Sequence, residues 1–262
     1  GSSSNSLSHT SILSLHKDMQ GNIWVGTYYG GVNVFNPDKN NHSFYCAEPL
    51  REDCLSFPVV GKMTEDSAGN VWICTEGGGL NCYHGDTGVF SRYMYQKGDQ
   101  STLGSNNVKS VFYRKENNRL YAGTHLGGLF VLDLKSNKGH TLHHVTGDPA
   151  SLPHEIVNDI QEYKDGIAML TQGGPVFFDP VTEKFSPLTD DPSVQKLISR
   201  EYAFETFLID SRQRMWLAVG GGGIVCVNLS SSKVTQYLAD SEKDTLTVGR
   251  YKTVHIFEDN KG

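Results

Sequence analysis

The sequence lacks several features that would identify a function directly. None of its five cysteines stands in a Cys-x-x-Cys pair, so the usual zinc patterns are absent. No apolar run approaches the roughly 20 residues that a membrane helix needs. No basic stripe stands out, since 23 Lys and Arg face 29 Asp and Glu. We therefore expect neither nucleic-acid binding nor direct membrane contact. No Gly-x-x-x-x-Gly-Lys phosphate loop occurs either.

Helical periodicity and a secretion signal are also missing. No stretch keeps a 3.6-residue apolar period, so we expect helix to be nearly absent. Gly-Ser-Ser-Ser at positions 1 to 4 is interpreted as a cloning remnant, and residues 1–10 as a linker without a native targeting segment.

The sequence does contain a segment that recurs along its whole length. Its clearest copies are Asp18-Met-Gln-Gly-Asn-Ile-Trp24-Val-Gly-Thr-Tyr-Tyr-Gly-Gly-Val32 and Asp66-Ser-Ala-Gly-Asn-Val-Trp72-Ile-Cys-Thr-Glu-Gly-Gly-Gly-Leu80. Weaker copies centre on Tyr121, Ala168 and Trp216, so the centres are 48, 49, 47 and 48 residues apart. A repeat of this length indicates an array of similar supersecondary units.

Each repeat is predicted to form four antiparallel strands. An alternating run comes first, then a polar turn opened by Asp18, Asp66 or Asp210, the aromatic strand, a glycine-rich hairpin and two further strands. Bulky residues of the first run, among them Leu15, are expected to point inward. The aromatic of the second strand is expected to pack on the next sheet.

Four strands at this spacing predict an all-β fold, a β-propeller of four-stranded antiparallel blades. The expected blades are residues 11–58, 59–106, 107–155, 156–199 and 200–248. Residues 249–262 repeat only the opening of a blade, with a strand expected from Lys252 to Phe257. We therefore expect about five complete blades plus the first strand of a sixth, as a fragment of a larger ring.

The segments Asp18 to Val32 and Met63 to Leu80, with Leu7, Leu55, Leu103, Leu152 and Leu246 between blades, resemble the two-component regulator propeller repeat. The resemblance is weaker where Tyr121 and Ala168 replace tryptophan and Pro175 replaces glycine. It implies the periplasmic sensor region of a hybrid two-component system of gut Bacteroidetes. In that family two propellers and a β-sandwich precede a membrane helix, a histidine kinase and a DNA-binding regulator. No segment of these 262 residues resembles a kinase, a receiver or a DNA-binding domain.

The resemblance implies a non-catalytic propeller that senses an oligosaccharide from glycan breakdown, with the full-length protein a histidine kinase. The implied partners are that oligosaccharide, at a junction with other domains, and the second propeller and β-sandwich of the same chain. A homodimer is a further expectation. No catalytic residue, metal ligand or cofactor is predicted.

The hairpins between second and third strands should open on the same face as the links between blades. Their aromatic, carboxylate and amide side chains suit the apolar and hydroxyl surfaces of a sugar, although each one could equally be a solvated loop residue. The predicted ligand-binding residues are Tyr28, Tyr29, Glu76, His125 and Gln172.

Other interpretations of the chain stay open. A propeller lyase or glycosidase would need His, Arg and carboxylate groups converging on the axis, and a protein-interaction scaffold would need no pocket. His140, His143 and His144 form a histidine cluster that is expected to be a solvated outer strand. Cys46 and Cys54 lie in one loop and could pair in an oxidising compartment.

Overall fold

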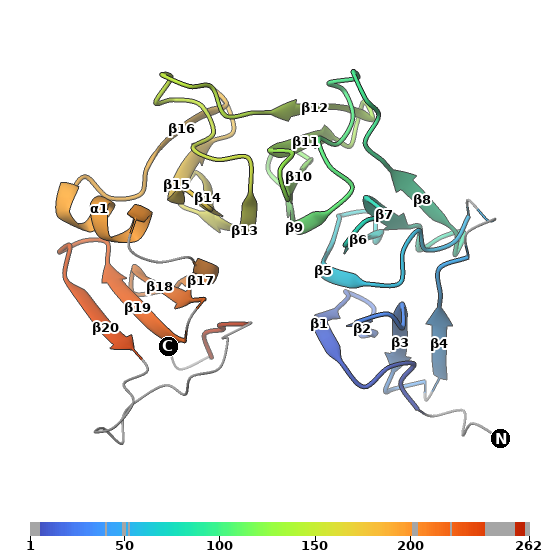
Figure 1. The fold of residues 1–262 in the computed structure, drawn as a ribbon. Helices are drawn as coiled ribbons and strands as arrows, with labels where there is room; N and C mark the ends of the chain where they lie inside the picture. Colours follow the sequence, from blue (N-terminus) through green and yellow to red (C-terminus); the bar gives the residue numbers. More distant parts are fainter. Residues whose placement is uncertain are drawn as a thin grey trace. The chain divides into compact units, whose positions relative to one another are not determined.

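The structure is a computed structural model that describes residues 6–39, 41–48, 51, 53–200, 204–220, 222–238 and 255–259. It divides into two compact units, Gly1–Leu142 and His143–Gly262 (Figure 1). Each unit is described below by itself.

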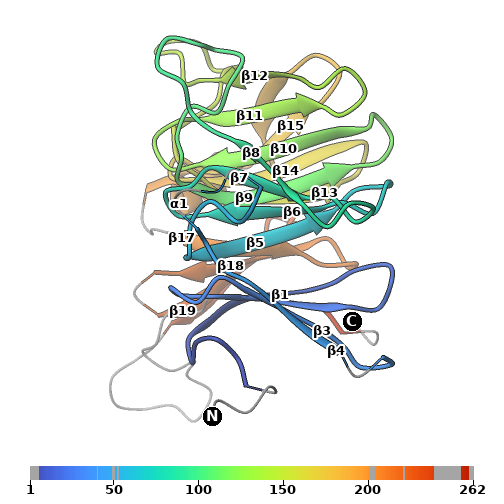
Figure 2. The ribbon, with the colours of Figure 1, turned by 90° about the vertical axis from the view of Figure 1, so that its right-hand side faces the viewer.

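The first unit contains three sheets. They are formed by β1 (Ile12–Lys17), β2 (Ile23–Thr27), β3 (Val32–Asn36) and β4 (Asn41–Tyr45); by β5 (Val60–Glu65), β6 (Val71–Thr75), β7 (Leu80–Tyr83) and β8 (Phe90–Tyr93); and by β9 (Val108–Arg114), β10 (Arg119–Thr124), β11 (Leu129–Asp133) and β12 (Lys138–Leu142). Their first strands, β1, β5 and β9, contact one another in that order (Figure 2).

The second unit contains two sheets and one helix. The sheets are formed by β13 (Val157–Tyr163), β14 (Gly166–Thr171), β15 (Gly174–Asp179) and β16 (Lys184–Pro187), and by β17 (Phe204–Ile209), β18 (Arg214–Val219), β19 (Gly223–Asn228) and β20 (Val234–Leu238). The helix α1 (Pro192–Arg200) lies between them in the chain.

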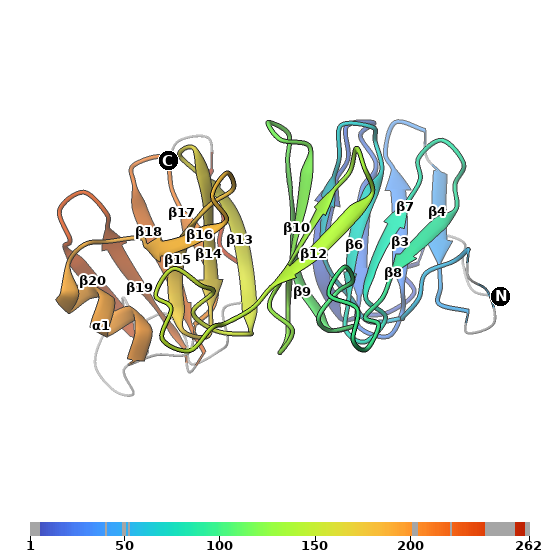
Figure 3. The ribbon, with the colours of Figure 1, turned by 90° about the horizontal axis from the view of Figure 1, so that it is seen from above.

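All five sheets are antiparallel and keep their strands in chain order. The expected fold class, propeller blades of four antiparallel strands, is therefore confirmed. In the first sheet Lys17 pairs with Ile23 and Ile12 pairs with Thr27. The turn after the first strand and the hairpin after the second strand therefore lie at opposite ends of a sheet (Figure 3).

A buried aspartate holds the turn after the first strand, which we call the Asp turn. Asp18 Oδ1 accepts hydrogen bonds from the amides of Gln20 and Asn22 at 3.0 and 2.7 Å, and its Oδ2 accepts one from Trp24 Nε1 at 2.8 Å. Gly21 adopts φ +83° within the turn, a conformation that favours glycine. The same pattern recurs at the other two predicted turns, where the indole donors are Trp72 to Asp66 (2.9 Å) and Trp216 to Asp210 (2.8 Å).

The anchored tryptophans join successive sheets of the first unit. Trp24 is 2 % exposed and packs with Val71 and Ile73 of the second sheet. Trp72 is 3 % exposed and packs with Leu120 and Ala122 of the third sheet. The predicted packing of this aromatic on the next sheet is confirmed for both.

In the second unit Trp216 is only half-buried, whereas the repeat predicts that it is largely buried between adjacent sheets. A cavity of about 390 Å³ lies beside it, lined in part by Ile256 and Phe257. Glu258 accepts hydrogen bonds from the amide and hydroxyl of Ser211 at 2.9 and 2.6 Å, much as Glu65 accepts one from the Met19 amide at 2.7 Å. The tail therefore contacts the sheet as a next repeat would, although it does not cover the indole.

The strand expected from Lys252 to Phe257 is not formed in its described part. Residues 252–254 lie outside the described residues, and 255–259 have no strand structure. A strand needs a neighbour with which to share backbone hydrogen bonds. In the described part of the chain residues 255–259 have no such pairing.

The helix α1 corrects the expectation that helix would be nearly absent. Its nine residues make more than two turns. Asp191 Oδ1 caps its start by accepting hydrogen bonds from the Ser193 and Val194 amides at 2.9 and 3.3 Å. Val194 and Ile198 are buried in the core of the second unit. Val194 and Ile198 have the spacing of one helix face, but nine residues are too few for a 3.6-residue apolar period to be recognised in the sequence.

One further expectation is wrong, and one possibility that the sequence left open is decided. Leu15 is 68 % exposed, because it lies on the face of the first sheet opposite Trp24. Cys46 and Cys54 are free thiols, the first exposed and the second buried. The Cys54 sulfur lies 3.3 Å from both the Arg51 carbonyl and Arg92 Nη2, so the backbone and arginine contacts of this loop occupy the sulfur.

We expect Trp72→Ala to lower the free energy of unfolding by about 3–5 kcal/mol, since it leaves a cavity between two sheets and removes the indole bond to Asp66. Denaturant titration of the 262-residue chain measures this. The half-buried Trp216 provides a matched control, because Trp216→Ala should cost less. A loss below about 1 kcal/mol for Trp72→Ala would contradict the packing described above.

Thiol counting tests the loop of Cys46 and Cys54. All five cysteines should react with a thiol reagent in denaturant without reductant, because none is bonded to another. A count of three that rises to five after reduction would show that Cys46 and Cys54 pair in solution.

Candidate functional site

Four of the five predicted ligand residues occupy one equivalent position in four sheets, and Tyr29 follows Tyr28. Each of the four begins the hairpin between second and third strands and donates its backbone amide to a carbonyl near the start of the same blade. These bonds join Tyr28 to Ser11 (3.0 Å), Glu76 to Val59 (3.1 Å), His125 to Asn107 (2.9 Å) and Gln172 to Ile156 (3.0 Å). The hairpins are thus tied to the links, as expected, and we call the hairpins of the first unit its hairpin rim.

The two tyrosines of the first hairpin form an aromatic pair. Their ring centroids lie 4.6 Å apart with the planes at 75°, an edge-to-face contact. Tyr28 is 42 % and Tyr29 61 % exposed, so both rings present apolar surface to solvent. Tyr29 adopts φ +67°, an uncommon backbone conformation that turns its side chain at the hairpin tip.

A charged pair lies at the hairpin of the second sheet. Glu76 Oε1 is 3.4 Å from Lys109 Nζ, and both side chains are partly exposed. The hydrogen bond with Tyr29 raises the pKa of Tyr28, and the charge of Glu76 adds to this. Tyr28 and Tyr29 are thus in contact with each other, and Glu76 begins the equivalent hairpin of the second sheet.

His125 and Gln172 hold the corresponding places in other sheets. His125 lies in the third sheet of the first unit and is half-buried. Gln172 lies in the second unit, where its side chain is exposed and the next amide, Gly173 N, donates to Thr171 Oγ1 at 3.1 Å. No side-chain contact joins His125 to the pair at Tyr28.

Lys109 and His9 are rim residues that sequence reasoning did not select. Asn107 forms a β-bridge with Glu76, and Lys109 follows Asn107 by two residues. This register places the Lys109 amine beside the Glu76 carboxylate. His9 packs against Tyr28 with centroids 6.5 Å apart and accepts a hydrogen bond from the Ser11 amide at 3.0 Å. The same bond recurs in a later link, where the Ile156 amide donates to His154 Nδ1. Both links have a histidine two residues before the donor, a pattern that a comparison of the link sequences could have found.

The histidine cluster is held by protein contacts. His143 Nδ1 and the His144 amide contact the two oxygens of Glu155 at 3.1 and 2.8 Å, and His144 Nδ1 lies 2.8 Å from the Leu152 carbonyl. The sequence predicts that His143 and His144 lie on the outer strand and point to its opposite faces. The strand β12 ends at Leu142, so both residues follow the strand instead. Nowhere among the described residues do three His, Cys, Asp or Glu side chains gather in a way that could hold a metal ion.

The chain is similar to a known repeat family. Residues 6–29 match the sequence profile described as the two-component regulator propeller. No curated protein is significantly similar in sequence. The described part of the chain contains no helix that is both long and apolar enough to cross a membrane.

Solved structures share the fold at low sequence identity. One is the extracellular domain of BT3049 from B. thetaiotaomicron, described as a hybrid two-component system, with a TM-score of 0.74 and 23 % identity over 98 % of this chain and 32 % of that one. Another is the extracellular domain of BT4673 from B. thetaiotaomicron, with a TM-score of 0.68 and 21 % identity over 89 % of this chain and 32 % of that one. The WD40 repeats of RRP9 match with a TM-score of 0.61 at 12 % identity, over 89 % of this chain and 67 % of that one.

The chain therefore spans about a third of the length of each of these two bacterial domains. Identities of this size establish a shared fold and leave ligand and activity open. The chain carries a two-component regulator propeller repeat at residues 6–29 and has the propeller-blade fold found in the extracellular domains of such systems.

Proposed function

We propose that this chain is a non-catalytic, ligand-sensing propeller segment of a periplasmic two-component sensor. Its ligand is an oligosaccharide released by glycan breakdown, and its output passes through a histidine kinase and a regulator elsewhere in the same protein. The observation that carries this proposal is the hairpin rim, which presents two exposed tyrosine rings at the first hairpin and the Glu76–Lys109 pair at the second.

The rim has the chemistry that sugar binding requires. The exposed faces of Tyr28 and Tyr29 suit the apolar C–H surface of a sugar ring. Glu76 offers carboxylate acceptors and Lys109 offers amine donors to hydroxyl groups nearby. His125 adds a ring that both donates and accepts, in the adjacent sheet of the same unit.

Signalling would follow from a shift between two arrangements of the sensor. A ligand moves such an equilibrium only when it binds one arrangement more tightly than the other. The rim hairpins are bonded to the links between blades, so a sugar that spans two hairpins favours one spacing of the sheets. The second propeller and the β-sandwich of the same protein would complete the site and transmit that preference.

The same proposal includes contacts with further protein surfaces. The face of the first sheet opposite Trp24 exposes Leu15 and Phe44, which are 68 % and 47 % accessible. Exposed apolar surface of this kind is typical of a contact face. We assign it to another domain of the same polypeptide, with a homodimer as the alternative outcome.

Calorimetry on the whole extracytoplasmic region, with oligosaccharides from digested glycans, tests the proposed site. Tyr28→Ala, Glu76→Ala and His125→Ala should each weaken binding by about tenfold, or about 1.4 kcal/mol, because each removes a direct contact. Met19→Ala, an exposed change at the Asp-turn end of the first sheet, should leave the affinity unchanged.

Unchanged affinity in all three rim variants would place the ligand elsewhere. Turnover of the bound oligosaccharide would favour a lyase or glycosidase over a sensor. Binding of a protein partner without any sugar binding would favour the scaffold.

A further inference from the structure

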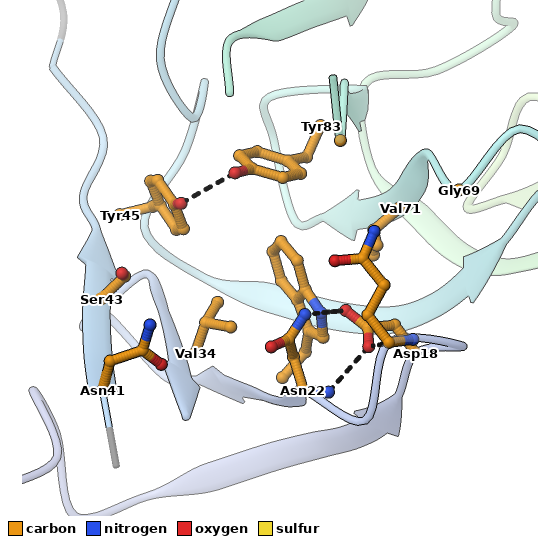
Figure 4. A pocket seen from close by; sticks show the side chains of 12 residues that line it. Asp18, Asn22, Val34, Asn41, Ser43, Tyr45, Gly69, Val71 and Tyr83 are labelled. Carbon is orange, nitrogen blue, oxygen red and sulfur yellow. Dashed lines mark hydrogen bonds between the residues drawn. The ribbon is translucent and has the colours of Figure 1, made fainter. Parts of the chain in front are cut away.

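A second, separate pocket lies between the first and second sheets of the first unit. It is lined by Asp18, Gln20, Asn22, Trp24, Val34, Asn41, Ser43, Tyr45, Gly69, Val71, Tyr83 and Gly85, and its volume is about 140 Å³ (Figure 4). It includes the Asp turn, whereas Tyr28 and Tyr29 lie in the hairpin at the other end of the sheet. The pocket and the hairpin rim are therefore distinct sites.

Sequence differences between two sheet junctions explain why space remains here. Val71 pairs with Tyr83 in the second sheet, and Leu120 pairs with Leu132 at the same place in the third. Two residues further on, the second sheet has Gly85, whereas the third has Leu134. Leu132 and Leu134 both pack into the apolar core of the second junction. At the first junction Tyr83 stands in place of Leu132, and Gly85 lies so close to Gly69 that an added Cβ would be 2.7 Å from the Gly69 carbonyl oxygen. No side chain at position 85 can therefore fill the space beside Tyr83.

Three aromatic rings form one wall of the pocket. Tyr45 stacks on Trp24 with centroids 6.1 Å apart and planes at 11°, and Tyr83 meets Trp24 edge-on at 5.0 Å. The Tyr45 hydroxyl donates to the Tyr83 hydroxyl at 3.0 Å. Figure 4 shows this tyrosine pair at one end of the pocket and Asp18 with Asn22 at the other. The wall is preorganised, because each ring is held by the other two.

The pocket offers a ligand neither a cation nor a free carboxylate oxygen, because its one acidic side chain, Asp18, is saturated by internal hydrogen bonds. Asp18 accepts four hydrogen bonds, from the amides of Gln20 and Asn22, from Asn22 Nδ2 and from Trp24 Nε1. These bonds fill the acceptor sites of the carboxylate. The twelve lining residues include no Lys, Arg or His. Burial and the bond to Tyr83 raise the pKa of Tyr45, so its phenol stays neutral.

The rest of the lining supplies neutral polar groups. Gln20, Asn41 and Ser43 are exposed and carry amide and hydroxyl groups that both donate and accept. Val34 and Val71 add small apolar surfaces. Aromatic faces, aliphatic patches and neutral hydrogen-bonding groups together match a molecule with C–H surface and several hydroxyls.

The volume limits the size of that molecule. A cavity of about 150 Å³ is known to hold benzene, a ring of six heavy atoms. The present pocket, at about 140 Å³, therefore has room for one six-membered ring, with its substituents toward the open side.

We propose that the pocket between the first two sheets binds a single neutral pyranose unit, in contact with Tyr45 and Tyr83 and hydrogen-bonded by Gln20, Asn41 and Ser43. This site is independent of the oligosaccharide site proposed at the hairpin rim. Its small contact area corresponds to a dissociation constant in the millimolar range.

Nuclear magnetic resonance titration of the 262-residue chain with methyl glucoside, methyl galactoside and methyl mannoside tests the proposal. At least one of these neutral sugars should give saturable shifts in the amides of residues 18–22, 41–45 and 83–85. Shifts confined to residues 28–29, 76 and 109 would instead report the rim, so the two sites are separately testable. Glucuronate, which carries a charge, should bind at least about tenfold more weakly.

Two variants and a matched control complete the experiment. Ser43→Tyr fills the exposed mouth of the pocket, and Tyr83→Leu copies the residue of the next junction; each should weaken binding by at least about tenfold. Phe44→Tyr changes the neighbouring residue on the opposite face of β4 and should leave binding unchanged. The melting temperature of each variant establishes that it folds.

Three outcomes would overturn the proposal. These are no saturable shift up to about 100 mM of any neutral sugar, equal binding by the folded Ser43→Tyr variant, and stronger binding of glucuronate.

Discussion

The hydrogen bond from a tryptophan indole to the buried aspartate of the Asp turn is the contact on which the first unit depends. It fixes the ring of Trp24 or Trp72 at the edge of its own sheet and presents it to the next sheet. A wide aromatic ring fills the wedge between twisted sheets, and the aspartate satisfies the only polar atom that this burial removes from water. One bond thereby links a local turn to the packing of neighbouring sheets.

This division of roles leaves the two ends of each sheet free for different tasks. At the Asp-turn end the carboxylate oxygens of Asp18 are saturated by internal donors, so this aspartate itself is structural. At the hairpin end the first residue of four hairpins donates its backbone amide to a link carbonyl, a bond that does not depend on the identity of its side chain. Variation from Tyr28 to Glu76 to His125 on one constant backbone is how repeat proteins build binding surfaces.

Departures from the repeat locate the places where the fold is least uniform. Tyr83 and Gly85, the latter close to the Gly69 carbonyl, line a pocket between the first two sheets. Asp191 and Pro192 begin a helix whose apolar side packs into the second unit. Trp216 lacks a complete neighbouring sheet among the described residues and is therefore half-buried, although its bond to Asp210 is kept. Each departure has a local cause in one or two residues.

The sequence by itself determined the all-β class, the four-stranded unit and the Asp turns, because a period of 47 to 49 residues and strand alternation depend only on local order. It also identified Tyr28, Glu76, His125 and Gln172 as equivalent positions. Only the tertiary structure decided the pairing of Lys109 with Glu76, the exposure of Leu15, the free Cys46 and Cys54 thiols and the pocket beside Tyr83. These depend on which side chains of different strands and loops meet, and no spacing along the chain encodes those distances.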